Sequence, residues 1–224
     1  MVSLITDGRS TDENGRPFRR RRYLPWLVMA AIVCLLATVV WVRALTKDED
    51  TSTAMNCNSP SQRSASTSAA APAPLGKRVG QSRLHDAEPA PLAATKVRVL
   101  NANGNRGEAS HIASTLGELG FGTVDPGNDP VYVDQNMQCY GQIRFGEKGR
   151  AAAASVQLAA PCAELIEDQR PDELIDLALG TYFRDLRPNN DAEEVLRALK
   201  NPPPGGQMAP LDIKLLEAAR KAKC

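Results

Sequence analysis

Apolar residues run almost without interruption from Tyr23 to Val42, and no charged residue falls among these 20 positions. At 1.5 Å of rise per residue, a helix of this length spans about 30 Å, the hydrocarbon thickness of a bilayer. Arg16 and four arginines at 19–22 precede the run, whereas basic and acidic residues mix after it. Because positive charge favours the cytoplasmic side, the pattern predicts a transmembrane helix over residues 23–42 with a cytoplasmic N-terminus.

A cleaved signal peptide is the alternative interpretation of the same run. The run is longer than the roughly 7 to 15 residues of a signal-peptide core, and Trp26 and Trp41 stand near its ends, where interfacial aromatic residues belong. The stretch Val42-Arg43-Ala44 is also a poor cleavage site. We therefore expect an uncleaved, single-pass anchor in the cell membrane and an extracytoplasmic remainder.

The polar segments on either side of the apolar run have too little apolar surface to form a core. Residues 1–22 are expected to be a disordered cytoplasmic tail, and residues 43–94, rich in Ser, Ala and Pro, a flexible linker. About 48 flexible residues have a root-mean-square reach of about 35 to 40 Å, which would lift a domain away from the bilayer.

Strand and helix periodicities alternate after the linker and predict one small α/β domain over residues 95–200, with helices packed on a sheet. Leu211 to Lys221 carries leucines on one face, so residues 201–224 are expected to be a Pro-rich connection and a C-terminal docking helix. The predicted strands cover 96–101, 142–146 and 173–180, and the predicted helices 109–119, ended by a glycine, 147–160 and 190–200.

The chain contains five cysteines, and their positions indicate whether the domain lies in an oxidising compartment. Cys34 lies in the apolar run, and the other four cysteines fall on the predicted outer side. An even number of cysteines in an oxidising environment indicates two disulfides. Three pairings are open; we prefer Cys139 with Cys162, which bracket one strand–helix unit, leaving Cys57 with Cys224. No metal site is expected, because no Cys-x-x-Cys pair occurs.

Catalysis finds little support in the sequence. His85 falls in the linker and His111 on the polar side of a predicted helix, and neither has a nucleophile nearby in sequence. Two pairs of adjacent acidic residues, at 167–168 and 193–194, are most simply explained as side chains on solvent-exposed faces of regular elements. No phosphate-binding loop, nucleophile elbow or zinc-protease motif occurs. The formal net charge of +1 does not indicate nucleic-acid binding, and no motif implies a cofactor.

One loop invites a functional interpretation. Asn103, Gly104, Arg106 and Gly107 connect a predicted strand to a helix whose first N–H groups favour anions. A carboxylate or phosphate of a wall polymer would fit beside Arg106. The simpler explanation is a tight turn, because Gly104 and Gly107 permit a positive φ.

The segment from Val97 to Ala109 (VRVLNANGNRGEA), and the helix exit at Leu116-Gly-Glu-Leu-Gly-Phe-Gly122, resemble the opening of the LytR C-terminal-type domain. Ile143-Arg-Phe-Gly146 with its Ala-rich helix, and Leu177-Ala-Leu-Gly180 before Phe183, resemble that domain's second half. The resemblance covers about residues 95–187. With the arginine-rich tail, the anchor and four outer cysteines, the whole chain is similar to mycobacterial envelope integrity proteins.

The resemblance implies a role in keeping the cell envelope intact, and no reaction. Larger LytR-type proteins carry a separate phosphotransferase domain, which this chain lacks the length to contain, and the C-terminal-type module has no established catalytic residues. We expect a non-enzymatic protein that is anchored in the bilayer by residues 23–42 and binds an envelope protein or cell-wall polymer. The alternatives are a cell-wall polymer hydrolase or transferase, and a regulatory subunit of a wall-building complex.

Overall fold

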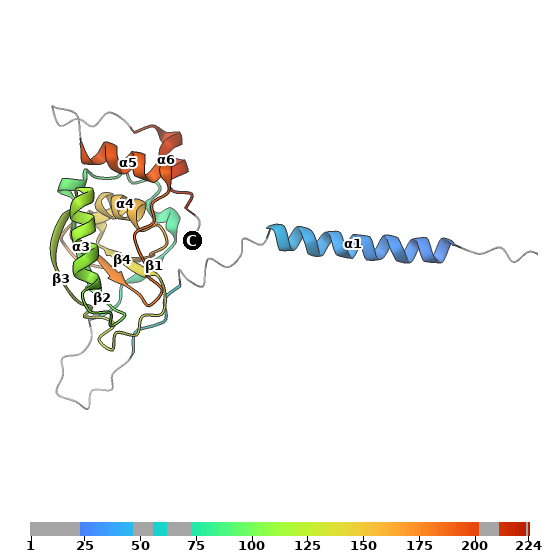
Figure 1. The fold of residues 1–224 in the computed structure, drawn as a ribbon, viewed down its shortest axis with the longest axis horizontal. Helices are drawn as coiled ribbons and strands as arrows, with labels where there is room; N and C mark the ends of the chain where they lie inside the picture. Colours follow the sequence, from blue (N-terminus) through green and yellow to red (C-terminus); the bar gives the residue numbers. More distant parts are fainter. Residues whose placement is uncertain (1–22, 47–55, 62–72, 202–210, 223) are drawn as a thin grey trace, which may run out of the picture. The chain divides into compact units, whose positions relative to one another are not determined.

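The computed structural model describes residues 23–46, 56–61, 73–201, 211–222 and 224 (Figure 1). The chain divides into two compact units, residues 1–49 and 50–224. The predicted tail over 1–22, and the parts of the predicted linker and connection at 47–55, 62–72 and 202–210, lie outside the described residues.

The first unit contains the helix α1 (Leu24–Thr46). Its described side chains are exposed, including those of Trp26, Leu27 and Trp41. Among the residues whose side chains the structure describes, which for α1 are 25–39 and Trp41, no helix has both the length and the hydropathy of a membrane span.

The second unit is an α/β domain built on a mixed six-stranded sheet of order β1-β5-β4-β6-β2-β3. Strands β6, β2 and β3 run parallel to one another, β4 and β5 run parallel to each other, and β4 lies antiparallel to β6. The strands are β1 (Lys77–Val79), β2 (Lys96–Asn101), β3 (Gly122–Asn128), β4 (Gly141–Phe145), β5 (Glu164–Glu167) and β6 (Ile175–Leu179).

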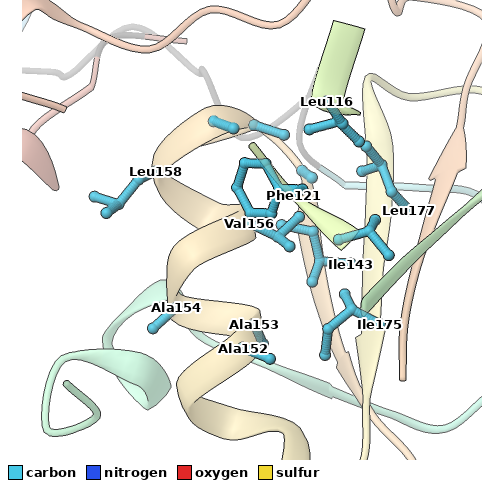
Figure 2. Close-up of a cluster of buried hydrophobic side chains, with 14 of the residues drawn as sticks. Leu116, Phe121, Ile143, Ala152, Ala153, Ala154, Val156, Leu158, Ile175 and Leu177 are labelled. Carbon is cyan, nitrogen blue, oxygen red and sulfur yellow. The ribbon is translucent and has the colours of Figure 1, made fainter. Parts of the chain in front are cut away.

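Within the described residues, four helices and three short 3-10 turns accompany the sheet, and the main core lies between the helices and one sheet face. Figure 2 shows part of this cluster, in which Phe121 and Val156 gather with Ile143 and Ile175. α5 packs on α4, and α6 packs on α5. The elements are η1 (Gln81–Leu84), η2 (Leu92–Ala94), α3 (Glu108–Leu119), η3 (Glu147–Gly149), α4 (Arg150–Ala159), α5 (Asn190–Lys200) and α6 (Ile213–Ala219).

The second sheet face is covered by loops rather than helices. Side chains alternate along a strand, so the residues of β4 that face away from the helices are Gln142 and Arg144, and both are buried. A smaller apolar cluster lies over this face and includes Leu100, Tyr132 and Met137. Both faces of the central strands β4 and β6 are therefore buried, and charged residues are among the buried side chains of the second face.

The segment before residue 95 corrects the predicted linker boundary. Leu84 and Leu92 are completely buried, and β1 pairs with β5 as an edge strand. Further back, the N–H of Ala73 donates to the carbonyl of Pro130. The buried leucines, the pairing of β1 with β5 and this hydrogen bond make the segment part of the domain.

The cysteine pairing also differs from the preferred one. Cys57 bonds to Cys139, with Cα atoms 4.8 Å apart, and Cys162 bonds to Cys224, with Cα atoms 5.4 Å apart. Cys139 belongs to the apolar cluster of the second face, whereas Cys162 belongs to the cluster on the helix face. The preferred bond between Cys139 and Cys162 was wrong because the sheet separates the two side chains.

Candidate ligand-binding site

A polar depression of about 480 Å³ opens where β2 and β3 end and α3 begins. Because β2, β3 and β6 are parallel, their carboxyl ends meet at this one edge of the sheet, the position where ligands commonly bind in α/β folds. The lining residues are Asn101, Gly104, Arg106, Gly107, Ala109, Ser110, Pro126, Gly127, Asn128 and Gln135.

The loop after β2 is organised by the buried side chain of Asn101. Its Oδ1 accepts hydrogen bonds from the N–H groups of Asn103 and Gly104, and its Nδ2 donates to the carbonyl of Asn105. Gly104 and Gly107 have φ values of 82° and 81°, a region that residues with a Cβ rarely adopt. The predicted tight turn is therefore present.

Asn103 holds the loop against its neighbours and does not line the depression. Its Nδ2 donates to Glu108 Oε2 at 2.6 Å and to the carbonyl of Gly180, at the end of β6, at 2.9 Å. Its Oδ1 accepts from the N–H of Asn105. Of the four residues proposed from the sequence, Asn103 thus has a structural role in the loop. The other three, Gly104, Arg106 and Gly107, line the depression.

Arg106 is exposed and makes no hydrogen bond or ion pair with any described residue. It stands next to Gly107, the N-cap of α3, which has no side chain to satisfy the first N–H groups of the helix. The loop therefore presents a guanidinium beside the positive end of a helix dipole. Glu108 partly balances this charge, although its carboxylate is held by Asn103.

The far wall of the depression comes from residues that the sequence did not suggest. Gln135 belongs to the loop that covers the second sheet face, and its φ of 53° is the one positive value among the described residues other than glycine. A Cβ at Gly104 would lie 3.3 Å from Gln135 Oε1, so the two loops approach closely. Pro126-Gly127-Asn128 has the composition of a turn, but nothing in the sequence places Gln135 beside Gly104.

The residues considered for catalysis lie elsewhere. His85 and His111 are exposed, and neither lines the depression. Glu167 is bound by both Arg83 Nε and Nη2, and this hydrogen-bonded pair lowers the pKa of its carboxyl. Within the described ranges, no group of three or more His, Cys, Asp or Glu side chains is placed to hold a metal ion.

A second, more apolar groove of about 610 Å³ runs between residues 85–88 and α6. Arg220 lies in its wall and donates hydrogen bonds to the carbonyls of Leu84, His85 and Ala87. Burial lowers the pKa of its guanidinium, although three carbonyls hold it. Arg220 thus fastens α6 to the turn after η1, together with the bond from Cys162 to Cys224.

Comparison with known proteins places this fold in a family. Residues 94–183 match the LytR cell envelope-related transcriptional attenuator family. The chain is 43% identical to the cell envelope integrity protein Cei of Mycobacterium tuberculosis over 224 residues, which is the whole of both chains. It is also 45% identical to the crystallised soluble domain of a conserved hypothetical secreted protein from Mycobacterium marinum. That match covers 67% of this chain and 99% of the other, with a TM-score of 0.61. The resemblance seen in the sequence is confirmed: the chain belongs to the family of the cell envelope integrity protein Cei and carries a LytR C-terminal-type domain.

Proposed function

We propose that this chain is a membrane-anchored, non-enzymatic protein that contributes to envelope integrity by binding an envelope protein or cell-wall polymer through its α/β domain. The name of the Mycobacterium tuberculosis relative supports the envelope role. The binding role is carried by one observation, the chemistry of the depression beside Arg106.

The lining of that depression suits recognition better than acid–base chemistry. It offers one guanidinium, the amides of Asn128 and Gln135 and the hydroxyl of Ser110, and it contains no carboxylate, histidine, lysine or cysteine. A hydrolase or transferase needs a general acid or base within hydrogen-bond reach of the reacting atoms. The groups present here donate hydrogen bonds and carry positive charge, which fits a carboxylate or phosphate on the ligand.

The proposed membrane anchor rests on the sequence of α1. Its 23 residues would extend about 35 Å as a helix, and residues 23–42 contain no charge. The arginines at 19–22 orient it with the N-terminus inside. Exposed Trp26 and Trp41 lie near the ends of the uncharged run, as expected of interfacial aromatic residues.

The test is to express the full chain in cells that lack it and to measure envelope permeability and retention by isolated envelope material. Arg106→Ala should lower both complementation and retention, whereas Arg197→Ala, an exposed arginine on α5, should leave them unchanged. Equal retention of the two variants would remove the site. Release of soluble fragments from purified wall polymer by the wild-type chain would instead favour an enzyme.

A further inference from the structure

We propose that the Cys57–Cys139 disulfide sets the length of the tether between α1 and the domain, and thereby restricts the domain to partners at or next to the membrane. The inference rests on the proposed anchoring through α1. It names where the partner of the domain lies, which the proposed function leaves open.

Residues 56–61 are an integral part of the domain surface. Cys57 is 3% exposed and is bonded to Cys139. Asn58 Nδ2 donates to the carbonyl of Asn136 at 3.2 Å, and Asn58 Oδ1 accepts from the N–H of Gln138 at 2.7 Å. The Asn58 carbonyl also accepts from the hydroxyl of Tyr132.

Two further contacts extend this attachment along the segment. Arg78 Nη2 donates to the carbonyls of Cys57 and Asn58, and Arg78 also pairs with Glu164. Asn136 Nδ2 donates to Ser61 Oγ at 3.0 Å. Cys57 is therefore the point at which the chain coming from α1 first joins the domain by a covalent cross-link.

The position of Cys57 fixes an upper limit on the reach of the tether, whatever the conformation of the residues in between. Eleven residue steps separate Thr46, the end of α1, from Cys57. Fully extended, they span at most about 40 Å, and a flexible chain of that length has a root-mean-square span of about 20 Å. A tether that continued to Ala73, which the domain also holds, would extend to about 95 Å. The attachment at Cys57 thus shortens the maximum reach about 2.5-fold.

The attachment point lies at the same end of the sheet as the candidate site. Cys139 directly precedes β4, whose first residue pairs with the last residue of β6. The carbonyl of Cys139 accepts from the N–H of Tyr182, and the carbonyl of nearby Gly180 accepts from Asn103 in the site loop. The short tether therefore joins the domain near the depression, which points to a membrane protein or a membrane-bound molecule as the partner.

The experiment lengthens the chain at two places in the full-length protein. One variant carries 30 Gly/Ser residues inserted between Asp50 and Thr51, before Cys57, and the matched control carries the same insert between Ala69 and Ala70, after the attachment. Both are reconstituted in phosphatidylglycerol/phosphatidylcholine vesicles that contain an energy-transfer acceptor lipid. The donor fluorophore is placed at exposed His111 through an unnatural amino acid, so that no cysteine is added.

The wild type and the 69/70 insert should transfer energy to the bilayer equally, and the 50/51 insert should transfer several-fold less. Equal losses from both inserts, or no loss from either, would overturn the proposed tether. Vesicle flotation is measured on the same samples, because a chain that fails to float would refute the anchor itself. Non-reducing peptide mapping of each variant confirms that Cys57 remains bonded to Cys139.

Discussion

Arg144 and Asp129 form a bidentate ion pair beneath the loop that covers the second sheet face. Arg144 Nη1 and Nη2 lie 2.8 and 2.6 Å from the two carboxylate oxygens of Asp129, and the side chains are 4% and 0% exposed. Asp129 Oδ1 also accepts from the N–H of Val131, and Arg144 donates to Gln142 Oε1. The pair therefore fastens the loop from Asp129 onwards to the centre of the sheet.

Removal of one partner should destabilise the domain strongly. Arg144→Met leaves the Asp129 carboxylate buried without its cation, which should lower the free energy of unfolding by about 3 to 5 kcal/mol. Urea denaturation measures this loss. The control is Asp86→Ala, which breaks an ion pair to Arg150 in which Asp86 is largely exposed, and it should change little. Similar losses in both variants would show that the buried pair has no special role.

The two glutamates of β5 should respond to pH in opposite directions. Burial raises the pKa of the Glu164 carboxyl, so its folded state holds a proton more tightly than the unfolded chain. The stability that this proton supplies is present below the ordinary value of 4.5 and is lost as the pH rises through the folded pKa. Relative to Glu164→Gln, the wild type should therefore become less stable from pH 4.5 upwards.

Glu167 provides the matched comparison on the same strand. The hydrogen-bonded pair with Arg83 lowers its pKa, so its contribution is present above 4.5 and is lost as the pH falls through the folded value. Relative to Glu167→Gln, the wild type should become more stable as the pH rises towards 4.5. Denaturant unfolding of the three proteins from pH 3 to 7 tests both signs, and slopes of the same sign would contradict the assignment.

The Cys57–Cys139 disulfide should contribute substantially to stability. It closes a sequence separation of 82 residues, for which the chain-entropy estimate is about 4.5 kcal/mol. The double variant Cys57→Ser/Cys139→Ser, which leaves no unpaired thiol from this pair, should melt at a clearly lower temperature than the wild type. An unchanged melting temperature would show that the bond does not stabilise the native domain, and non-reducing digestion checks the pairing itself.

Gly180 should tolerate no side chain. A Cβ there would lie 2.1 Å from the carbonyl oxygen of Cys139, and the Gly180 carbonyl accepts a hydrogen bond from Asn103 in the site loop. Because backbone has to move to relieve the clash, Gly180→Ala should cost about 1 to 3 kcal/mol. Gly80→Ala is the control, since its nearest atom is Ser82 Oγ at 3.8 Å. Equal thermal stability of the two variants would mean that the 139–141 and 180–182 loops separate easily.

Elements with a single clear periodicity were predictable from the sequence. The predicted strand at 96–101 is β2, the predicted helix at 190–200 is α5, and the helix expected to end at Gly120 does so with the glycine at a φ of 109°. The predicted strands at 142–146 and 173–180 correspond to β4 and β6, within two residues at each end. These elements place apolar residues regularly against the helix-side core.

The remaining strands carry no such signal. β3 is exposed along most of its length and contains Pro126 and Gly127, residues that normally favour a loop. β1 has three residues and β5 has four, too few for a period of two to be distinguished. Their pairing depends on tertiary contacts, which local propensity does not determine.

The burial of the polar residues on the second sheet face could not be predicted for a different reason. Gln142, Arg144 and Asp176 alternate with apolar residues, a pattern that indicates one solvated face. The structure buries them because the loop from Asp129 supplies a matching carboxylate and Arg98 and Arg170 bind Asp176. At the candidate site, the loop from Asn103 to Gly107 could be identified from the sequence. Gln135 could not, because only the tertiary fold brings it next to this loop.

The most direct test of the proposed function is photo-crosslinking in cells from Ser110, which lines the depression and leaves Arg106 in place. The photoreactive residue is introduced into the full-length chain at Ser110 and, as a control, at Arg197 on α5. We predict capture of a specific envelope protein or glycopolymer from Ser110 that is absent from Arg197 and is lost when Arg106→Ala is added. The same products from both positions, or capture unaffected by Arg106→Ala, would contradict a ligand site at this edge of the sheet.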